Sequence, residues 1–180
     1  MDDLNKRILT DLKVELTEEF DRNFERKAFF SKPWKPRKQD GRGTLMLQTG
    51  KLRRSIRSKI NKDSVSWATS EPYAAIHNNG GTITVTAKMK RFFWAKYYEL
   101  AGKVKYKKDG STSRTSLKVS KQAEFYHNLA LMKVGTKIKI PQRQFLGDAP
   151  EIHQTVDKIC QKQFQEIKKQ LYSTLKKGLK

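Results

Sequence analysis

The stretch I-P-Q-R-Q-F-L-G, residues 140–147, separates two kinds of chain and decides the expected fold. Before it, residues 134–140 carry apolar side chains at even spacings, which is the period of a strand with one buried face. Pro141 has no N–H to donate to a neighbouring strand, so it ends the ladder. The stretch therefore predicts a strand-to-helix junction, with Phe145 and Leu146 filling the joint.

The chain after residue 147 has the pattern of a long amphipathic helix. Asp148 is expected to cap its start, with Glu151 three residues later completing a capping box and a proline between them in the first turn. Apolar side chains then recur every three to five residues, which places them on one helical face. They are Ile152, Val156, Ile159, Phe164, Ile167, Leu171 and Leu175.

Earlier segments predict a mixture of helices and short strands. Residues 2–26 carry apolar side chains every four residues and predict a packing helix. Residues 45–60 fit a basic amphipathic helix, although a two-residue repeat there also permits a strand. Strands are expected at 64–69 and 82–87, with a turn at 78–81 between them. Residues 88–100 and 121–133 predict two helices joined by a loop at 101–120, which together make an inserted basic helical hairpin, 88–133.

Composition favours one domain, residues 1–180, that is long enough to bury a core. Hydrophobic residues make up 36% of the chain and charged residues 32%. No run is apolar enough to span a membrane, and the acidic start does not resemble a signal peptide. The single cysteine, Cys160, cannot form an internal disulfide and is expected to be a small buried side chain in a protein of a reducing cytoplasm.

The net charge of +21 is concentrated in two segments. Residues 32–59 contain ten Lys or Arg and one acidic residue, and residues 88–121 contain eleven against two, so each segment has a net charge of +9. Such clustering indicates a polyanionic partner, either nucleic acid or an acidic protein surface, although a solvated surface is also consistent with it. The candidate contact residues are Arg53, Arg54, Arg57, Lys90, Arg91, Lys105, Lys107 and Lys108.

Aromatic residues and histidines leave their roles open. Trp34, between two prolines, either anchors a loop on the core or stacks on a base. The basic and aromatic segment 88–100 is typical both of a single-strand nucleic-acid platform and of an oligomer interface. His77 is expected to be structural rather than catalytic. No phosphate loop, dinucleotide fingerprint, paired carboxylates or metal-ligand spacing occurs, so we expect no catalytic residue, cofactor, metal or small-molecule substrate.

Three motifs in order resemble the Mu-like phage virion-morphogenesis family, also called tail-completion proteins. They are T-G-K-L-R-R-S-I at 49–56, Y-A-A-I-H-N-N-G-G at 73–81, and I-P-Q-R-Q-F-L-G at 140–147, with a tryptophan before the first. The residues that match the family pattern, expected to serve fold and assembly, are Trp34, Thr49, Gly50, Leu52, Ser55, Ile56, Tyr73, Ala74, Ile76, His77, Gly80, Gly81, Pro141, Arg143, Phe145, Leu146 and Gly147.

The resemblance implies an α+β fold in which the first and last helices pack on a small antiparallel sheet built around Trp67, Val85 and Ile138. It implies a structural protein of a phage or prophage, made in the host cytoplasm and found in the virion tail or neck. Copies would form a ring that joins head and tail, with other tail or neck proteins as partners and double-stranded DNA as a further contact. The alternative is a basic nucleic-acid-binding module.

Two features depart from the family pattern. The residue before the two glycines is often aromatic in the family and is Asn79 here. The hairpin 88–133 is longer than the family core needs, and the resemblance implies nothing about its role.

Overall fold

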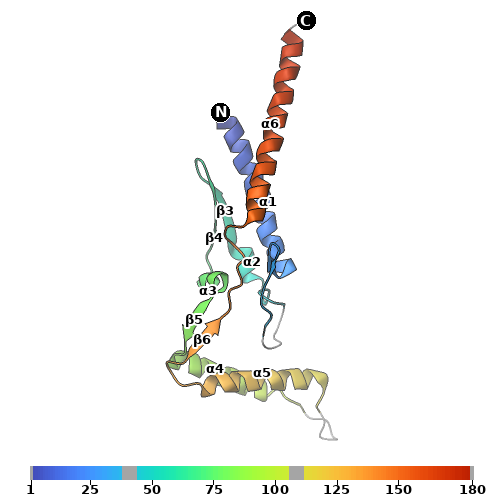
Figure 1. The fold of residues 1–180 in the computed structure, drawn as a ribbon. Coiled ribbons are helices and arrows are strands. Elements are labelled where there is room, and N and C mark those ends of the chain that lie inside the picture. The colour runs from blue at the N-terminus through green and yellow to red at the C-terminus, as the bar shows by residue number, and fades with distance from the viewer. Residues whose placement is uncertain (1, 38–43, 106–111, 179–180) are drawn as a thin grey trace. The chain divides into compact units, whose positions relative to one another are not determined.

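The computed structural model describes residues 2–37, 44–105 and 112–178, and its mixture of helices and antiparallel strands confirms the α+β class (Figure 1). The described residues form two compact units. One contains residues 2–36, 44–79 and 142–178, and the other contains residues 37, 80–105 and 112–141. No helix in the described ranges is long and apolar enough to cross a membrane.

The first unit is organised on helix α1 (Asp2–Arg26), which confirms the predicted N-terminal helix. Its later turns bury Leu16, Phe20 and Phe24, because apolar residues four apart lie on neighbouring parts of one face. Two very short strands follow, β1 (Ala28–Phe29) and β2 (Lys32–Pro33). In the turn between them Phe30 has φ 50°. The backbone N–H of Phe30 donates a hydrogen bond to the side-chain oxygen of Asn23 at 2.9 Å.

Residues 45–60 divide between a helix and a strand. Helix α2 (Lys51–Ser55) has a single turn and is followed at once by strand β3 (Ile56–Ile60). Strand β3 pairs antiparallel with β4 (Val65–Thr69), the strand predicted around Trp67. The helical prediction is therefore wrong beyond Ser55. The alternating half-buried residues of β3 gain a paired partner strand, which a free helix would not have provided.

Helix α3 (Ala74–Asn79) follows β4 in the first unit and takes up the first two residues, 78 and 79, of the predicted turn at 78–81. The last helix, α6 (Pro150–Gly178), confirms the predicted C-terminal helix and packs against α1. Its predicted capping box is wrong. The helix begins after Ala149, Asp148 pairs with His153 at 2.9 Å, and Glu151 accepts from Ser31 instead of folding back.

The second unit pairs a β-ribbon with two helices. Strands β5 (Gly81–Thr84) and β6 (Lys137–Ile140) pair antiparallel, with Ile83 opposite Ile138. Val85 follows β5, is fully buried and exchanges backbone hydrogen bonds with Gly135 and Thr136. The prediction of one sheet around Trp67, Val85 and Ile138 is wrong. The described strands form separate two-stranded ladders, because α3 stands where a tight turn would have joined β4 to β5.

Helices α4 (Ala87–Ala101) and α5 (Arg114–Leu131) pack against each other. Thr86 and Ser113 cap them, each accepting a hydrogen bond from the backbone N–H three residues later. The predicted loop at 101–120 is wrong from Arg114 onward, and residues 106–111 lie outside the described ranges. The helix extends because small residues seven apart are buried along it, which allows close packing. These are Ser116, Ala123 and Ala130.

Candidate functional site

The three sequence motifs and Trp34 meet in one buried cluster of the first unit. The cluster contains one residue from α1, one from the segment after β2, and one from each motif. They are Phe24, Trp34, Leu52, Ala74 and Phe145. The ring of Phe24 lies 5.7 Å from Trp34 and 5.4 Å from Phe145, measured between centroids. Phe145 is 1% exposed and packs among the other residues of this cluster.

Hydrogen bonds hold the 142–147 segment to this cluster. The side-chain oxygen of Asn78 accepts from the backbone N–H of Phe145 at 2.9 Å and of Leu146 at 3.0 Å. The backbone N–H of Arg143 donates a hydrogen bond to the backbone carbonyl of His77 at 2.8 Å. Trp34 donates its indole N–H to the carbonyl of Gln144 at 2.6 Å, which confirms the anchoring role rather than base stacking. The segment has no regular secondary structure, so these bonds provide its backbone with partners.

Arg143 is buried and its side chain binds the backbone of the loop before the first motif. Its guanidinium donates to the carbonyls of Lys35 at 3.0 Å and Pro36 at 3.3 Å, and 8% of the residue is exposed. Hydrogen bonds to the main chain compensate part of the cost of burying this charge. An arginine in this position ties two distant segments together and is not accessible to a polyanion.

His77 is half-buried beside Tyr73, whose ring lies edge-on at 5.9 Å. Burial, and then the positive charge of Arg143, lower the pKa of His77 below its ordinary value, so the ring is neutral at pH 7. Its Nδ1 atom is buried and has no hydrogen-bond partner among the described residues. The printed ring contact of His77 is thus with Tyr73 of the same helical segment, and its carbonyl accepts from the backbone N–H of Arg143.

Other motif residues shape the turns around the cluster. Gly50, with φ 71°, is the N-cap of α2. Ser55 and Thr69 share a hydrogen bond of 2.6 Å that ties the end of α2 to β4. Gly147 has φ 140°, and a Cβ there would lie 2.5 Å from the Gln144 side chain. Ile56 begins β3 and packs on the cluster, and Ile76 is half-buried in α3. Leu146 packs on this cluster and also on the neighbouring one that contains Leu16 and Phe20. The motif residues Gly80, Gly81 and Pro141 belong to the second unit.

The candidate polyanion contacts fall into two groups. In the first unit, Arg53 pairs with Asp21 and with Glu25 at 2.8 Å, and these bonds raise its pKa. Arg54 donates to the carbonyl of Thr49, and Arg57 to that of Arg54. Each of these three guanidinium groups therefore already donates hydrogen bonds within the first unit.

In the second unit, the side chains of Lys90, Arg91 and Lys105 make no hydrogen bond or ion pair with described residues. Arg91 and Lys105 are exposed, and Lys90 is half-buried. Lys107 and Lys108 lie outside the described ranges. Among the candidate contacts, those described without a side-chain hydrogen bond or ion pair therefore lie in the second unit.

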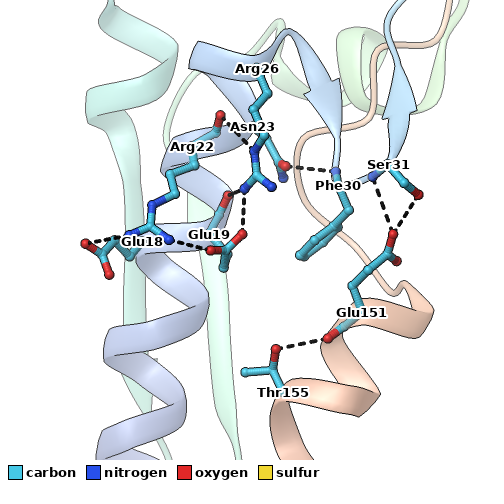
Figure 2. A network of polar contacts seen from close by, with 9 residues as sticks. All are labelled: Glu18, Glu19, Arg22, Asn23, Arg26, Phe30, Ser31, Glu151 and Thr155. Atoms are coloured by element: carbon cyan, nitrogen blue, oxygen red, sulfur yellow. Dashed lines mark hydrogen bonds and ion pairs between the residues drawn. The ribbon is translucent and has the colours of Figure 1, made fainter.

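Polar contacts lie within α1, between α1 and the turn at residues 30–31, and between that turn and the start of α6 (Figure 2). Burial raises the pKa of Glu19, but hydrogen bonds from Arg26 at 2.5 Å and Arg22 at 2.7 Å lower it below its usual value. Ser31 donates its hydroxyl to Glu151 at 2.7 Å, which lowers the pKa of that carboxyl. A hollow of about 490 Å³ is lined by Glu19, Arg26, Ser31 and Glu151, together with Glu15 and Lys158. No group of three or more potential ligands in the described ranges could hold a metal ion.

Sequence reasoning missed three residues of this site. Asn78 was assigned to a turn and is a clamp at the end of α3, and Phe24 and Asn23 were assigned only to a packing helix. Phe24 was visible in the sequence as an apolar position of α1. Asn78 lies in the run N-N-G-G at 78–81, and such a run is also typical of turns, so its role as a hydrogen-bond acceptor could not be read from the sequence.

This arrangement defines a class of protein: a structural module whose motif residues build a core and hold backbone segments together. The chain belongs to the phage virion morphogenesis family, since the model of that family matches residues 3–165. It therefore has a structural or assembly role in a phage virion. No curated protein matches the chain, and no solved structure does.

Proposed function

We propose that the chain completes the phage tail and helps to join head and tail as a ring of identical copies. The supporting observation is that all three motifs of the tail-completion resemblance meet in one core, around Phe145. A role in assembly fits residues that serve packing and backbone tethering. The proposed partners are other tail or neck proteins, with double-stranded DNA as a further contact, and the proposed locations are the host cytoplasm during assembly and then the virion.

The test is electron microscopy of lysates from a phage in which this gene is inactivated. We expect full heads and tails that fail to join, with joining restored by the wild-type chain. A His77→Gln, His153→Gln double variant should also restore joining, because neither ring is assigned chemistry. Normal virions without the gene would contradict the proposal, and loss of joining in a folded double variant would favour a catalytic role.

A nucleic-acid-binding role is the second candidate, and the unpaired cations of the second unit favour it. Arg91 and Lys105 are exposed on a chain with a net charge of +21. Binding through phosphates would weaken steeply with salt. A DNA affinity that barely changes between low and moderate salt would exclude this candidate.

A further inference from the structure

Helix α4 carries two stacked aromatic rings beside its packed face. The rings of Trp94 and Tyr98 lie 5.7 Å apart between centroids, and their planes are 22° from parallel. Trp94 is half-buried, and its ring meets His127 of α5 edge-on at 5.5 Å. Tyr98 is 65% exposed. Tyr98 is therefore the outer ring of a stack that the neighbouring helix supports from within.

Two cations lie on the same side of α4 as these rings. An α-helix turns by about 100° per residue, so residues 90, 91, 94 and 98 fall within an arc of about 100°. These four residues, Lys90, Arg91, Trp94 and Tyr98, are called here the basic aromatic face. The side chains of Lys90 and Arg91 make no hydrogen bond or ion pair with described residues. The remaining residues of α4 in this arc are Ala87 and Ala101, which are too small to cover the rings.

The unit that contains α4 is strongly basic. Its described residues include thirteen Lys or Arg and two Glu, a net charge of +11. One of the two acidic residues, Glu99, lies outside the arc and accepts hydrogen bonds from Lys96 at 2.6 Å and Lys103 at 2.8 Å. A second copy of this unit is a poor occupant for the basic aromatic face, because it would set like charges against each other.

The other acidic residue, Glu124 of α5, lies toward the Tyr98 end of the face. Helices α4 and α5 run antiparallel, and Trp94 is level with His127. Glu124 comes three residues before His127, so it lies about one turn further toward Tyr98. The cations lie at the opposite end, beside Trp94. A bound polyanion should therefore place its phosphate near Arg91 and an uncharged group on Tyr98.

We propose that the basic aromatic face binds single-stranded nucleic acid, with a base stacked on Tyr98 and a phosphate beside Lys90 and Arg91. Every base has a flat face that stacks on an exposed aromatic ring, and the backbone phosphates supply the charge that complements the two cations. The bases of a duplex are stacked on one another and paired, so Tyr98 cannot stack on them in the same way. The proposal rests on the second candidate function, nucleic-acid binding, and specifies the kind of strand.

The test is fluorescence anisotropy of the full chain with a labelled oligonucleotide of about twelve thymidines and with a duplex of the same length. The single strand should bind about tenfold or more tightly than the duplex. Tyr98→Leu should weaken single-strand binding about tenfold, whereas Tyr98→Phe, which keeps the ring, should retain the affinity. Phe92→Leu is the matched control, because Phe92 is 52% exposed on another side of the same helix.

The cations are tested in the same assay at several salt concentrations. Arg91→Gln should lower the slope of log affinity against log salt by about 0.7 for the single strand, which corresponds to one phosphate contact. Lys88→Gln is the matched control, because Lys88 is exposed on α4 outside the arc, and it should leave the slope unchanged. The replaced side chains are all exposed, so thermal unfolding should be the same in every variant.

Equal single-strand affinity in Tyr98→Leu and the wild type, or an equal loss in Phe92→Leu, would overturn the proposal. A duplex bound as tightly as the single strand would overturn it too, but would leave the nucleic-acid-binding candidate standing. Binding of neither would contradict both. Tighter binding of polyglutamate than of the oligonucleotide would overturn the proposal in favour of an acidic protein partner. An oligomer that Tyr98→Leu dissociates would overturn it in favour of a second copy.

Discussion

The side-chain oxygen of Asn78 accepts hydrogen bonds from the backbone of Phe145, 67 residues further along the chain, and from its neighbour Leu146. One amide at the end of α3 thus fixes the backbone of the third motif at the point where Phe145 enters the core. The second and third motifs are joined by polar contacts as well as by packing. Removing the acceptor should therefore loosen the junction between them.

We expect Asn78→Leu to destabilise the chain by about 1–3 kcal/mol, because two partly buried N–H groups lose their acceptor. Asn78→Asp should recover most of this loss, since a carboxylate oxygen can accept the same bonds. Urea unfolding followed by circular dichroism measures both variants. Equal loss in the two variants would mean that the amide oxygen is not the group that matters.

Phe145→Ala should cost about 3–5 kcal/mol of unfolding free energy, because it empties a site that Phe24 and its neighbours cannot refill. Phe145 is 1% exposed, and Phe164, at 59%, provides a matched control on α6. We expect Phe164→Ala to stay within about 0.5 kcal/mol of the wild type. Denaturant midpoints at constant slope give the comparison. A small effect at Phe145 would refute its central place in the core.

His77 should make the fold sensitive to mild acid. Burial and Arg143 lower its pKa in the folded chain, so the unfolded chain binds the proton more tightly. Stability should therefore fall as the pH drops below the ordinary histidine value of about 6.5, and this loss should be absent in His77→Gln. Thermal midpoints between about pH 5 and pH 8 measure the difference between the two proteins. Parallel curves over that range would contradict the prediction.

The two groups of basic residues should behave differently toward DNA. Arg91→Gln and Lys105→Gln change exposed, unpaired cations and should each lower the salt dependence of DNA binding by about one phosphate contact, with stability unchanged. Arg53→Gln breaks pairs with Asp21 and Glu25 and should lower stability instead. Fluorescence anisotropy over a range of salt concentrations, together with unfolding curves, distinguishes the effects. A salt dependence that Arg91→Gln and Lys105→Gln leave unchanged would place the contacts elsewhere.

Periodicity predicted the elements with the strongest repeats. Helix α1, strand β4, helix α4 and helix α6 lie where their patterns placed them. It did worse where two states competed. Residues 45–60 had both a helical and a strand repeat, and residues 114–120 had the composition of a loop. In each case the decision came from a partner element: β4 pairs with β3, and α4 packs on the small residues of α5.

Residue pattern alone was enough to predict the α+β class, the long amphipathic helices, the clustered positive charge and the resemblance to virion morphogenesis proteins. Each depends on residue types at short spacing or on their order along the chain. The folded chain was needed to show that Phe145 packs with Phe24 and Trp34, that Asn78 binds the backbone of the third motif, and that Arg53 is paired. The physical reason is range. Local spacing sets the period of a helix or strand, whereas burial and pairing depend on which distant segments the folded chain brings together.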